Sequence, residues 1–522
     1  MSFAANANDP SIFLHLCRGF PVLTITFKRS AMAMMAAAFL SPVAMADIGG
    51  GGATLPAKAY SGSSASSTAN GPRLSAPAPG SLFYEALPFT TQSYCQTGSG
   101  TGRSVLAGTN GNTDASRPCP ATFTDAFVNG TNGFSAPSID ADYAASDAPA
   151  GTGDFNAFIT NKASHEQMTQ FPSIAGSISV IANTPGTGLS TVYLTEAEVC
   201  NVFAGKITNW SQLAKPNGTA YQGKPIKLVY RSDSSGTSFG FSNHLNWVCS
   251  DAALAQTLAP VASTLPFPVA SNFSVQSTFA SAFPGGVVPA NAIAASGNPG
   301  VASVVDATDG AFGYVEAANA VAIGSTTFKP VQIAAVDTAA ELNPLDGTDT
   351  ARNTALYSSG TSNKIAFTVP KTFSDKDGNT YNGTYTDRAL QSNNASFGRP
   401  IGLPTALNTT QAPNHNCVFI VHPGAYATSP YVTAGSPTSG YSSYPIVAVT
   451  YLLGNYALNG SADDMRALLG SPYNFALRSN QGGSVNTVGA KTGFAYLTAI
   501  QAKPLSGGLV TLDQARVDAC TN

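Results

Sequence analysis

One strand-loop-helix segment restricts the fold more than any other part of the sequence. A β-branched run at 226–230 is typical of a strand, and the sequence RSDSSGTS follows it directly. Phe241, Leu245 and Val248 then recur at spacings of four and three, which predicts a helix over 236–248. A strand that passes through a glycine-containing loop into a helix is the repeating unit of α/β proteins, so we expect an α/β fold.

Other segments fit the same architecture. A helix is predicted over 194–205, because Thr195 and Glu198 form a capping-box pattern and Gly205 is a typical helix end. The glycine run at 49–52 indicates a close backbone approach before a helix. Apolar runs predict further strands at 177–181, 417–421 and 444–449.

The first residues are typical of an export signal. Lys28 and Arg29 precede a short apolar run at 31–40, and small residues follow before Asp47. The apolar run is about ten residues long, shorter than the roughly 20 that a membrane-spanning helix needs. We therefore predict a signal peptide over 1–46 that is cleaved before Asp47, and a mature protein in the periplasm or outside the cell.

Length and composition indicate more than one lobe. The chain has 522 residues, 43% of them hydrophobic, whereas single cores rarely grow that large. Asn, Thr, Gly and Asp dominate 326–415, where Asp377-Gly378 and Asn382-Gly383 predict hairpin turns. We expect a first lobe over 47–180, a second lobe over 181–325, a β-hairpin and loop insertion over 326–415, and a return to the first lobe over 416–522.

The charge pattern excludes one class of partner. The formal net charge is −3, and only 10% of the residues are charged. A mildly acidic chain lacks the basic surface that nucleic acids or anionic membranes require. We therefore expect no nucleic-acid partner and a local site for any anion. We also expect the protein to be a monomer.

Of the seven cysteines, Cys17 lies in the leader and six follow it. An even number in an exported protein is typical of disulfides, although the count leaves their pairing open. No CxxC or His/Cys cluster has metal-site spacing, and 375–379 lacks the glutamate of a calcium loop, so no metal or cofactor is predicted. We expect sequential disulfides: Cys95 with Cys119, Cys200 with Cys249, and Cys417 with Cys520.

Four separated segments carry the groups that an oxyanion site needs. They combine hydroxyl donors with small residues that expose backbone N–H groups, and a helix start favours negative charge. In the strongest segment, Ser235, Gly236 and Thr237 can present N–H groups and hydroxyls to one ligand. Arg231 adds a cationic fork. The other three segments are 53–55, 98–102 and 145–149.

Asp147 lies in the last of these segments, although a carboxylate repels an anion. Monohydrogen phosphate still carries a proton at neutral pH, and a carboxylate can accept a hydrogen bond from it. Sulfate has no proton to donate and meets only repulsion. We therefore expect Asp147 to select phosphate over sulfate.

Together, these segments resemble the phosphate-binding periplasmic proteins of ABC importers (PstS-like). The sequence DIGGGGATLP from Asp47 is similar to the start of their DING subfamily. The resemblance also covers LTEAEVCNVFAGKITNW at 194–210, RSDSSGTS at 231–238 and GNPGVASVVDATDGAFGYVE at 297–316. It implies a type II periplasmic-binding-protein fold, in which two α/β lobes joined by crossover strands enclose a hinge cleft, and it implies no enzymatic activity.

The resemblance also implies a binding role for individual residues. It supports the pairing of Cys200 with Cys249, and an inner-membrane ABC permease is the implied partner, with phosphate scavenging outside the cell as the alternative. Asp233 is expected to lie behind the binding residues and to hold Arg231 or the loop backbone. The residues implied to surround phosphate are Thr54, the Leu55 backbone, Ser99, Asp147, Arg231, Ser235, Gly236 and Thr237.

Two enzymatic alternatives are open. GTSFG at 236–240 matches the G-x-S-x-G pattern of α/β hydrolases, but Ser238 does not directly follow the predicted strand, which disfavours an esterase. A secreted phosphomonoesterase is the stronger alternative, because some DING-like proteins are associated with phosphatase activity. The mature histidines form no evident metal-ligand set in the sequence: His165, His244, His415 and His422.

Overall fold

The computed structural model describes the chain in ranges separated by gaps. These ranges are 48–62, 74–90, 92–109, 141–184, 192–213, 220–250, 271–322, 328–334, 366–368, 372–374, 380–382, 384–386, 407–427, 446–478, 484–489, 492–498, 500–502 and 508–522. The predicted signal peptide over 1–46 and its cleavage site before Asp47 lie outside them. No helix within these ranges is long and apolar enough to cross a lipid bilayer.

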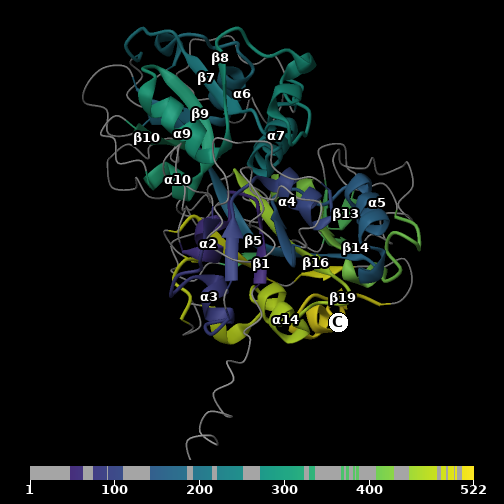
Figure 1. Cartoon of the computed structure of the whole chain (residues 1–522). Helices are drawn as coiled ribbons and strands as arrows, with labels where there is room; N and C mark the ends of the chain where they lie inside the picture. The colour runs from purple at the N-terminus through teal and green to yellow at the C-terminus, as the bar shows by residue number, and fades with distance from the viewer. Residues whose placement is uncertain are drawn as a thin grey trace, which may run out of the picture. The chain divides into compact units, whose positions relative to one another are not determined.

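A mixed sheet forms the frame of the described residues (Figure 1). Along its main path the strands are, in spatial order, β2 (Leu74–Ser75), β3 (Gln92–Cys95), β1 (Ile48–Gly52), β4 (Tyr143–Ser146), β16 (Val447–Asn455), β5 (Met168–Asn183), β9 (Ala311–Glu316), β7 (Lys227–Arg231) and β8 (Ala292–Ala295). Four more strands join it through β5: β6 (Val192–Thr195), β10 (Phe328–Ala334), β11 (Ala366–Thr368) and β17 (Phe494–Thr498). Parallel neighbours linked through helices, such as β1 with β3 and β7 with β8, confirm the predicted α/β fold.

β5 connects two groups of strands. Its first part, 168–177, pairs antiparallel with β16, and 178–182 pairs antiparallel with β9. The sequence predicted a strand only at 177–181, because polar residues interrupt the apolar pattern before it. Gln170 is one of them, and it is buried with its side-chain amide donating to the carbonyl oxygen of Phe419 at 3.0 Å. Hydrogen bonding thus allows polar residues inside a fully buried strand.

Glycines make up most of β1 because neighbouring backbone lies very close to it. A Cβ on Gly51 would stand 2.1 Å from the carbonyl oxygen of Cys95 on β3. Gly52 has a φ of +131°, which favours glycine. Helix α2 (Ala57–Ser61) follows after a short turn. The close approach predicted for the glycine run is therefore confirmed.

Helices pack against the strands of this sheet, as α9 (Gly297–Ala307) does beside β9, the strand that follows it in the chain (Figure 1). The predicted helices over 194–205 and 236–248 are confirmed as α6 and α7. Gly205, with a φ of +71°, lies just beyond α6. At the start of α7 the Ser235 hydroxyl accepts a hydrogen bond from the Ser238 N–H at 3.1 Å. The remaining helices are α3 (Leu82–Ala86), α4 (Ser99–Leu106), α5 (Thr152–Asn161), α6 (Glu196–Phe203), α7 (Gly236–Cys249), α9 (Gly297–Ala307), α10 (Ala317–Ala322), α12 (Pro423–Ala427), α14 (Ala462–Gly470) and α15 (Gln514–Ala519), with 3-10 helices η1 (Ala163–His165), η2 (Trp210–Gln212), η3 (Phe279–Ser281), η4 (Pro284–Gly286), η6 (His415–Cys417) and η8 (Phe475–Leu477).

Short strand pairs lie outside the main sheet. They are β12 (Thr372–Ser374) with β13 (Thr380–Asn382), β14 (Thr384–Thr386) with β15 (Phe419–Val421), and β18 (Gln501–Ala502) with β19 (Val510–Thr511). The antiparallel pairing of β12 with β13 confirms the hairpin predicted around Asp377-Gly378, although 375–379 lies outside the described residues. The hairpin predicted at Asn382-Gly383 is wrong, because β14 pairs with β15 and not with β13. Gly383 lies outside the described residues, and the strands on either side of it pair with different partners, β13 with β12 and β14 with β15.

Two of the predicted disulfides are confirmed. Cys200 of α6 is bonded to Cys249 at the end of α7, with their Cα atoms 5.6 Å apart. Cys417 of η6 is bonded to Cys520 next to α15, with their Cα atoms 5.5 Å apart. Cys119 lies outside the described residues, so its predicted bond to Cys95 stays a prediction.

Candidate anion-binding site

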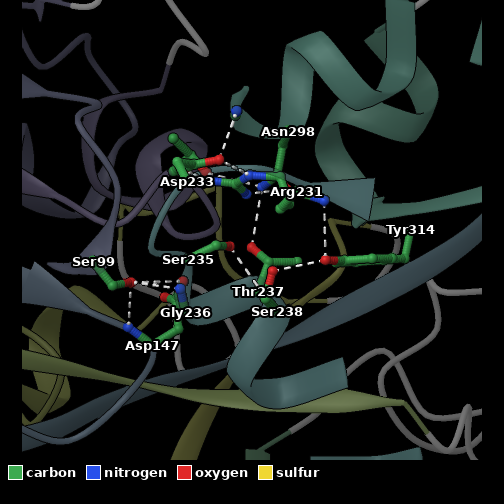
Figure 2. Close-up of polar contacts among 12 residues, drawn as sticks. Ser99, Asp147, Arg231, Asp233, Ser235, Gly236, Thr237, Ser238, Asn298 and Tyr314 are labelled. Carbon is green, nitrogen blue, oxygen red and sulfur yellow. Dashed lines mark hydrogen bonds and ion pairs between the residues drawn. The ribbon is translucent and has the colours of Figure 1, made fainter. Parts of the chain in front are cut away.

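The four predicted segments meet at the carboxyl ends of strands. Thr54 follows β1, Ser99 begins α4 after β3, and Asp147 directly follows β4. Because β3, β1 and β4 are parallel neighbours, their ends lie at the same edge of the sheet. Arg231 ends β7 and Gly236 begins α7. A hydrogen bond from the Gly236 N–H to the Ser99 hydroxyl oxygen, 3.0 Å long, joins these two groups of segments (Figure 2).

Ser99 lies at the centre of the first contact. Its hydroxyl oxygen accepts hydrogen bonds from the Gly236 N–H and from the Asp147 N–H, the latter at 3.1 Å. It lies 3.4 Å from Oδ2 of the Asp147 carboxyl. Only glycine fits at 236, since a Cβ there would stand 2.3 Å from the Ser99 hydroxyl oxygen and 2.4 Å from the Asp147 Cβ. The first turn of α7 therefore lies directly against the Asp147 side chain.

Asp147 is a buried acid with an unused acceptor. The residue is 1% exposed, and its Oδ1 has no hydrogen-bond partner among the described residues. Burial raises the pKa of Asp147 to about 7, against the opposing effects of the Arg231 charge, the Ser99 hydroxyl and the Arg103 charge. The carboxyl therefore changes its charge near neutral pH. It can accept a proton-bearing ligand group when ionised and can donate a hydrogen bond when protonated.

This raised pKa predicts a pH-dependent stability. The folded protein holds a proton on Asp147 that the unfolded chain releases above pH 3.8, so the free energy of unfolding should fall as pH rises from about 4 to about 7. The slope from this one group is up to about 1.4 kcal/mol per pH unit. Urea unfolding in oxyanion-free buffer should show this slope as the difference between the native protein and Asp147→Asn. Parallel stability curves for the two proteins would contradict the buried, protonated state.

Arg231 is the buried cation of the site. Its side chain is fully buried, its Nε donates to Oδ1 of Asp233 at 2.7 Å, and its Nη2 pairs with Oδ2 of the same carboxylate. Burial alone lowers the pKa of Arg231, but the Asp233 charge outweighs it and the pKa is raised. Asp233 also accepts a hydrogen bond from the Gly297 N–H at 3.0 Å. Asp233 thus fixes the plane of the guanidinium from behind, as Figure 2 shows.

Asn298 is a central residue that the sequence reasoning missed. Its Oδ1 accepts a hydrogen bond from Nη1 of Arg231 at 2.7 Å. Its Nδ2 lies 3.0 Å from the Thr54 hydroxyl oxygen and 3.2 Å from the Thr237 hydroxyl oxygen, donating to both. Asn298 thereby links all three of these predicted residues. The signal was present, because GNPG at the start of α9 follows a strand and contains glycine at a helix start, as the other segments do.

The remaining predicted residues lie in the same network with different roles. The Ser235 hydroxyl oxygen is used as the cap of α7, because it accepts the Ser238 N–H. Leu55 is fully buried in the turn between β1 and α2. Within the described part of the chain, the backbone N–H groups of Leu55 and Thr237 make no hydrogen bond. Unsatisfied N–H groups at a helix start are donors that an oxyanion can use.

The position of Ser238 argues against the esterase alternative. Ser238 lies within α7 and is fully buried, with its hydroxyl 2.7 Å from the Tyr314 hydroxyl. A nucleophilic serine needs an exposed hydroxyl next to a base. Tyr314 also accepts the Arg231 backbone N–H at 3.3 Å, so this pair supports the arginine. Across the described ranges, no group of three His, Cys, Asp or Glu side chains could hold a metal ion.

Comparison with known proteins gives one family and several partial relatives. A family model described as a PBP superfamily domain matches residues 51–381. Alkaline phosphatase L of Pseudomonas aeruginosa is 32% identical over 294 residues, which is 55% of this chain and 61% of that protein. Phosphate-binding protein PstS of Xylella fastidiosa is 33% identical over 156 residues, which is 29% of this chain and 36% of that protein. The chain thus spans less than two thirds of the length of these curated relatives.

One solved structure illustrates the structural likeness. It is a phosphate binding protein from Stenotrophomonas maltophilia, 23% identical, and the match covers 82% of this chain and 84% of that one at a TM-score of 0.44.

Proposed function

The chain belongs to the PBP superfamily, and we propose that it is an exported, high-affinity binding protein for inorganic phosphate that performs no chemistry. Asp147 carries this proposal. Its buried Oδ1 has no partner among the described residues, while the charged Arg231 and backbone donors surround the same site. A monohydrogen phosphate dianion supplies negative charge to Arg231 and the N–H groups. It also supplies a proton that the Asp147 carboxylate can accept in a hydrogen bond.

Binding proceeds by closure of two lobes on the ligand. The first lobe comprises 47–180 with 416–522, the second comprises 181–325, and 326–415 is an insertion. Segments assigned to the two lobes meet at the site, since Thr54 and Ser99 from the first contact Asn298 and Gly236 from the second. β5 runs through both strand groups and is the connection about which the lobes move. Phosphate stabilises the closed state because it contacts both lobes at once.

Each binding residue contributes one of three interactions. Arg231 supplies the positive charge, and Asp147 accepts the phosphate proton. The remaining groups donate hydrogen bonds to phosphate oxygens: the hydroxyls of Thr54, Ser99, Ser235 and Thr237, and the backbone N–H groups of Leu55, Gly236 and Thr237. Phosphate replaces the Ser99 hydroxyl oxygen as the acceptor of the Gly236 N–H.

The protein acts outside the cytoplasm. A leader over 1–46 is removed before Asp47, and the mature chain is a monomer in the periplasm or the extracellular medium that binds no nucleic acid. An inner-membrane ABC permease that recognises the closed state is one partner. Phosphate scavenging without a permease is the alternative.

A secreted phosphomonoesterase is the second candidate function. The name of the Pseudomonas aeruginosa relative, alkaline phosphatase L, favours it. The buried positions of Arg231 and Asp147 favour binding, because a phosphoester needs room for its alcohol group.

One preparation tests both candidates. Purified protein is denatured in acid and its released phosphate is measured, and a second sample is assayed for p-nitrophenyl phosphate hydrolysis with and without added divalent metal ions. The binding function predicts about one phosphate per chain and no turnover above the buffer rate. Hydrolysis that co-purifies with the protein and disappears in Arg231→Ala would favour the phosphatase.

Gly236→Ala should weaken phosphate binding while the protein stays folded. The new methyl group would meet the Ser99 hydroxyl and the Asp147 Cβ, so it forces the first turn of α7 away from both. We expect a loss of about 1–3 kcal/mol, roughly fivefold to 150-fold in Kd, measured by calorimetric titration. Gly153→Ala in α5 is the matched control, because a Cβ there meets no atom within 4 Å. Equal affinities of the two variants would mean that α7 does not approach the ligand at Gly236.

A further inference from the structure

Arg103 is a cation that the binding mechanism above does not use. It lies on α4, one helical turn after Ser99, and its side chain is only 12% exposed. Its Nη1 donates to the Ser146 hydroxyl oxygen at 2.7 Å and lies 3.5 Å from the carbonyl oxygen of Ala148. Arg103 thus contacts the residues on both sides of Asp147. The turn that carries the Asp147 carboxyl is held by this guanidinium.

Asp154 completes the arrangement. Its Oδ2 pairs with Nε of Arg103 at 2.9 Å, and its side chain is 20% exposed. The same oxygen accepts the Gly151 N–H at 2.8 Å, which fixes Asp154 at the start of α5. An ion pair this shielded from solvent interacts with nearby charges more strongly than a surface pair does.

Few charges act on Asp147 within the described residues. Arg231 on β7 and Arg103 on α4 both stabilise its ionised form. The other titratable neighbours are buried tyrosines whose pKa values burial raises, so they stay neutral: Tyr60 on α2, Tyr94 on β3 and Tyr426 on α12. The charge of Arg231 is balanced by Asp233, and its guanidinium contacts the ligand in the proposed binding mode. Arg103, balanced by Asp154, is therefore the cation that can adjust the carboxyl without contacting the ligand.

We propose that the Arg103–Asp154 ion pair sets the charge of the Asp147 carboxyl and so determines how strongly the site prefers monohydrogen phosphate over sulfate. This rests on the proposed phosphate-binding function. Arg103 is a positioning residue in this scheme, because it touches the turn that carries Asp147 and not the anion.

Arg103 and Asp154 should have opposite effects on the protonation of Asp147. A purely structural role of the ion pair would not produce opposite effects. An ionised Asp147 repels sulfate, whereas a protonated Asp147 donates a hydrogen bond to it. Removing the Arg103 charge makes Asp147 hold its proton to higher pH, so sulfate should bind over a wider pH range. Removing the Asp154 charge makes Asp147 lose its proton at lower pH, so sulfate should be rejected more strongly. Phosphate brings its own proton and should respond less.

Calorimetric titration of Arg103→Gln, Arg103→Lys, Asp154→Asn and the native protein with phosphate and with sulfate, between about pH 5.5 and 9, tests the proposal. Arg103→Gln should move the sulfate profile to higher pH, with about a tenfold loss of phosphate preference at pH 8. Asp154→Asn should move it to lower pH, and Arg103→Lys should restore much of the native profile. Arg466→Gln on α14 is the control, since its partner Asp463 is 94% exposed.

The outcomes are distinguishable. Shifts of the two variants in the same direction, or unchanged sulfate profiles with phosphate binding retained, would overturn the role of Arg103. Absence of phosphate binding in the native protein would instead overturn the proposed function.

Discussion

Replacing Arg231 with alanine should reduce phosphate affinity by about 3–5 kcal/mol, roughly 150-fold to 5,000-fold in Kd. The guanidinium is the buried cation of the site, fully enclosed and held by Asp233 and Asn298. Its loss leaves a phosphate dianion without a compensating charge in a water-poor environment. Calorimetric titration of the phosphate-stripped variant measures the loss directly.

Removal of Arg231 also leaves Asp233 as an unpaired buried acid, so folding has to be checked separately. Arg231→Lys keeps the charge but loses the two-pronged pairing with Asp233. It should fold and bind phosphate with intermediate affinity. Arg466→Gln on α14, where the arginine pairs with the exposed Asp463, should bind like the native protein. A folded Arg231→Ala protein with native phosphate affinity would contradict the assignment of Arg231 as the anion's counter-charge.

Asp147→Asn should lose most of the discrimination between phosphate and sulfate. The asparagine amide can donate to sulfate, whereas the ionised carboxylate repels it, and the substitution changes the shape of the side chain very little. We expect the ratio of the sulfate dissociation constant to the phosphate dissociation constant to fall roughly thirtyfold, which corresponds to on the order of 2 kcal/mol. Competition titrations at about pH 8, above the raised pKa of Asp147, measure this ratio with the native carboxyl ionised.

Asp463→Asn is the matched control for this change, because it makes the same substitution at an exposed side chain. Its selectivity should equal that of the native protein. Unchanged selectivity in Asp147→Asn, with phosphate still bound, would show that the unpartnered Oδ1 does not face the ligand.

Local patterns predicted the parts of the fold that local physics determines. α7 followed from its apolar spacing, and α6 from its capping pattern and terminal glycine. The strand predictions at 417–421 and 444–449 are confirmed as β15 and β16, whose first residues are apolar and buried on both faces. The secondary structure of such segments can be predicted from their own residues.

Pairings between segments far apart in the sequence could not be predicted from local patterns. The start of β5 at Met168 was missed. Its first half contains buried polar residues such as Gln170, whose hydrogen-bond partner Phe419 lies far away in the sequence. β14 pairs with β15 across the gap from 386 to 419, which no turn signal indicates. Sequence spacing describes neighbours along the chain, whereas these pairings depend on where distant segments return.

The candidate site also contains both residues that local patterns predicted and residues that they did not. Arg231 and Ser99 stood out because their residue types suit an oxyanion, and Asp147 stood out because its carboxylate can accept the proton of monohydrogen phosphate. Asn298 was overlooked because an amide is chemically neutral, and its importance appears only when Thr54, Thr237 and Arg231 meet around it. Arg103 was overlooked because an arginine on an amphipathic helix is usually a surface residue, and here it turns inward to the Asp147 turn.

Calorimetric titration of the phosphate-stripped mature protein with phosphate, repeated in the presence of excess sulfate at about pH 8, tests the central claim most directly. The account predicts tight binding of one phosphate per chain that sulfate does not weaken, because Asp147 is ionised at that pH. Absence of phosphate binding, or displacement of phosphate by sulfate at comparable concentration, would contradict it.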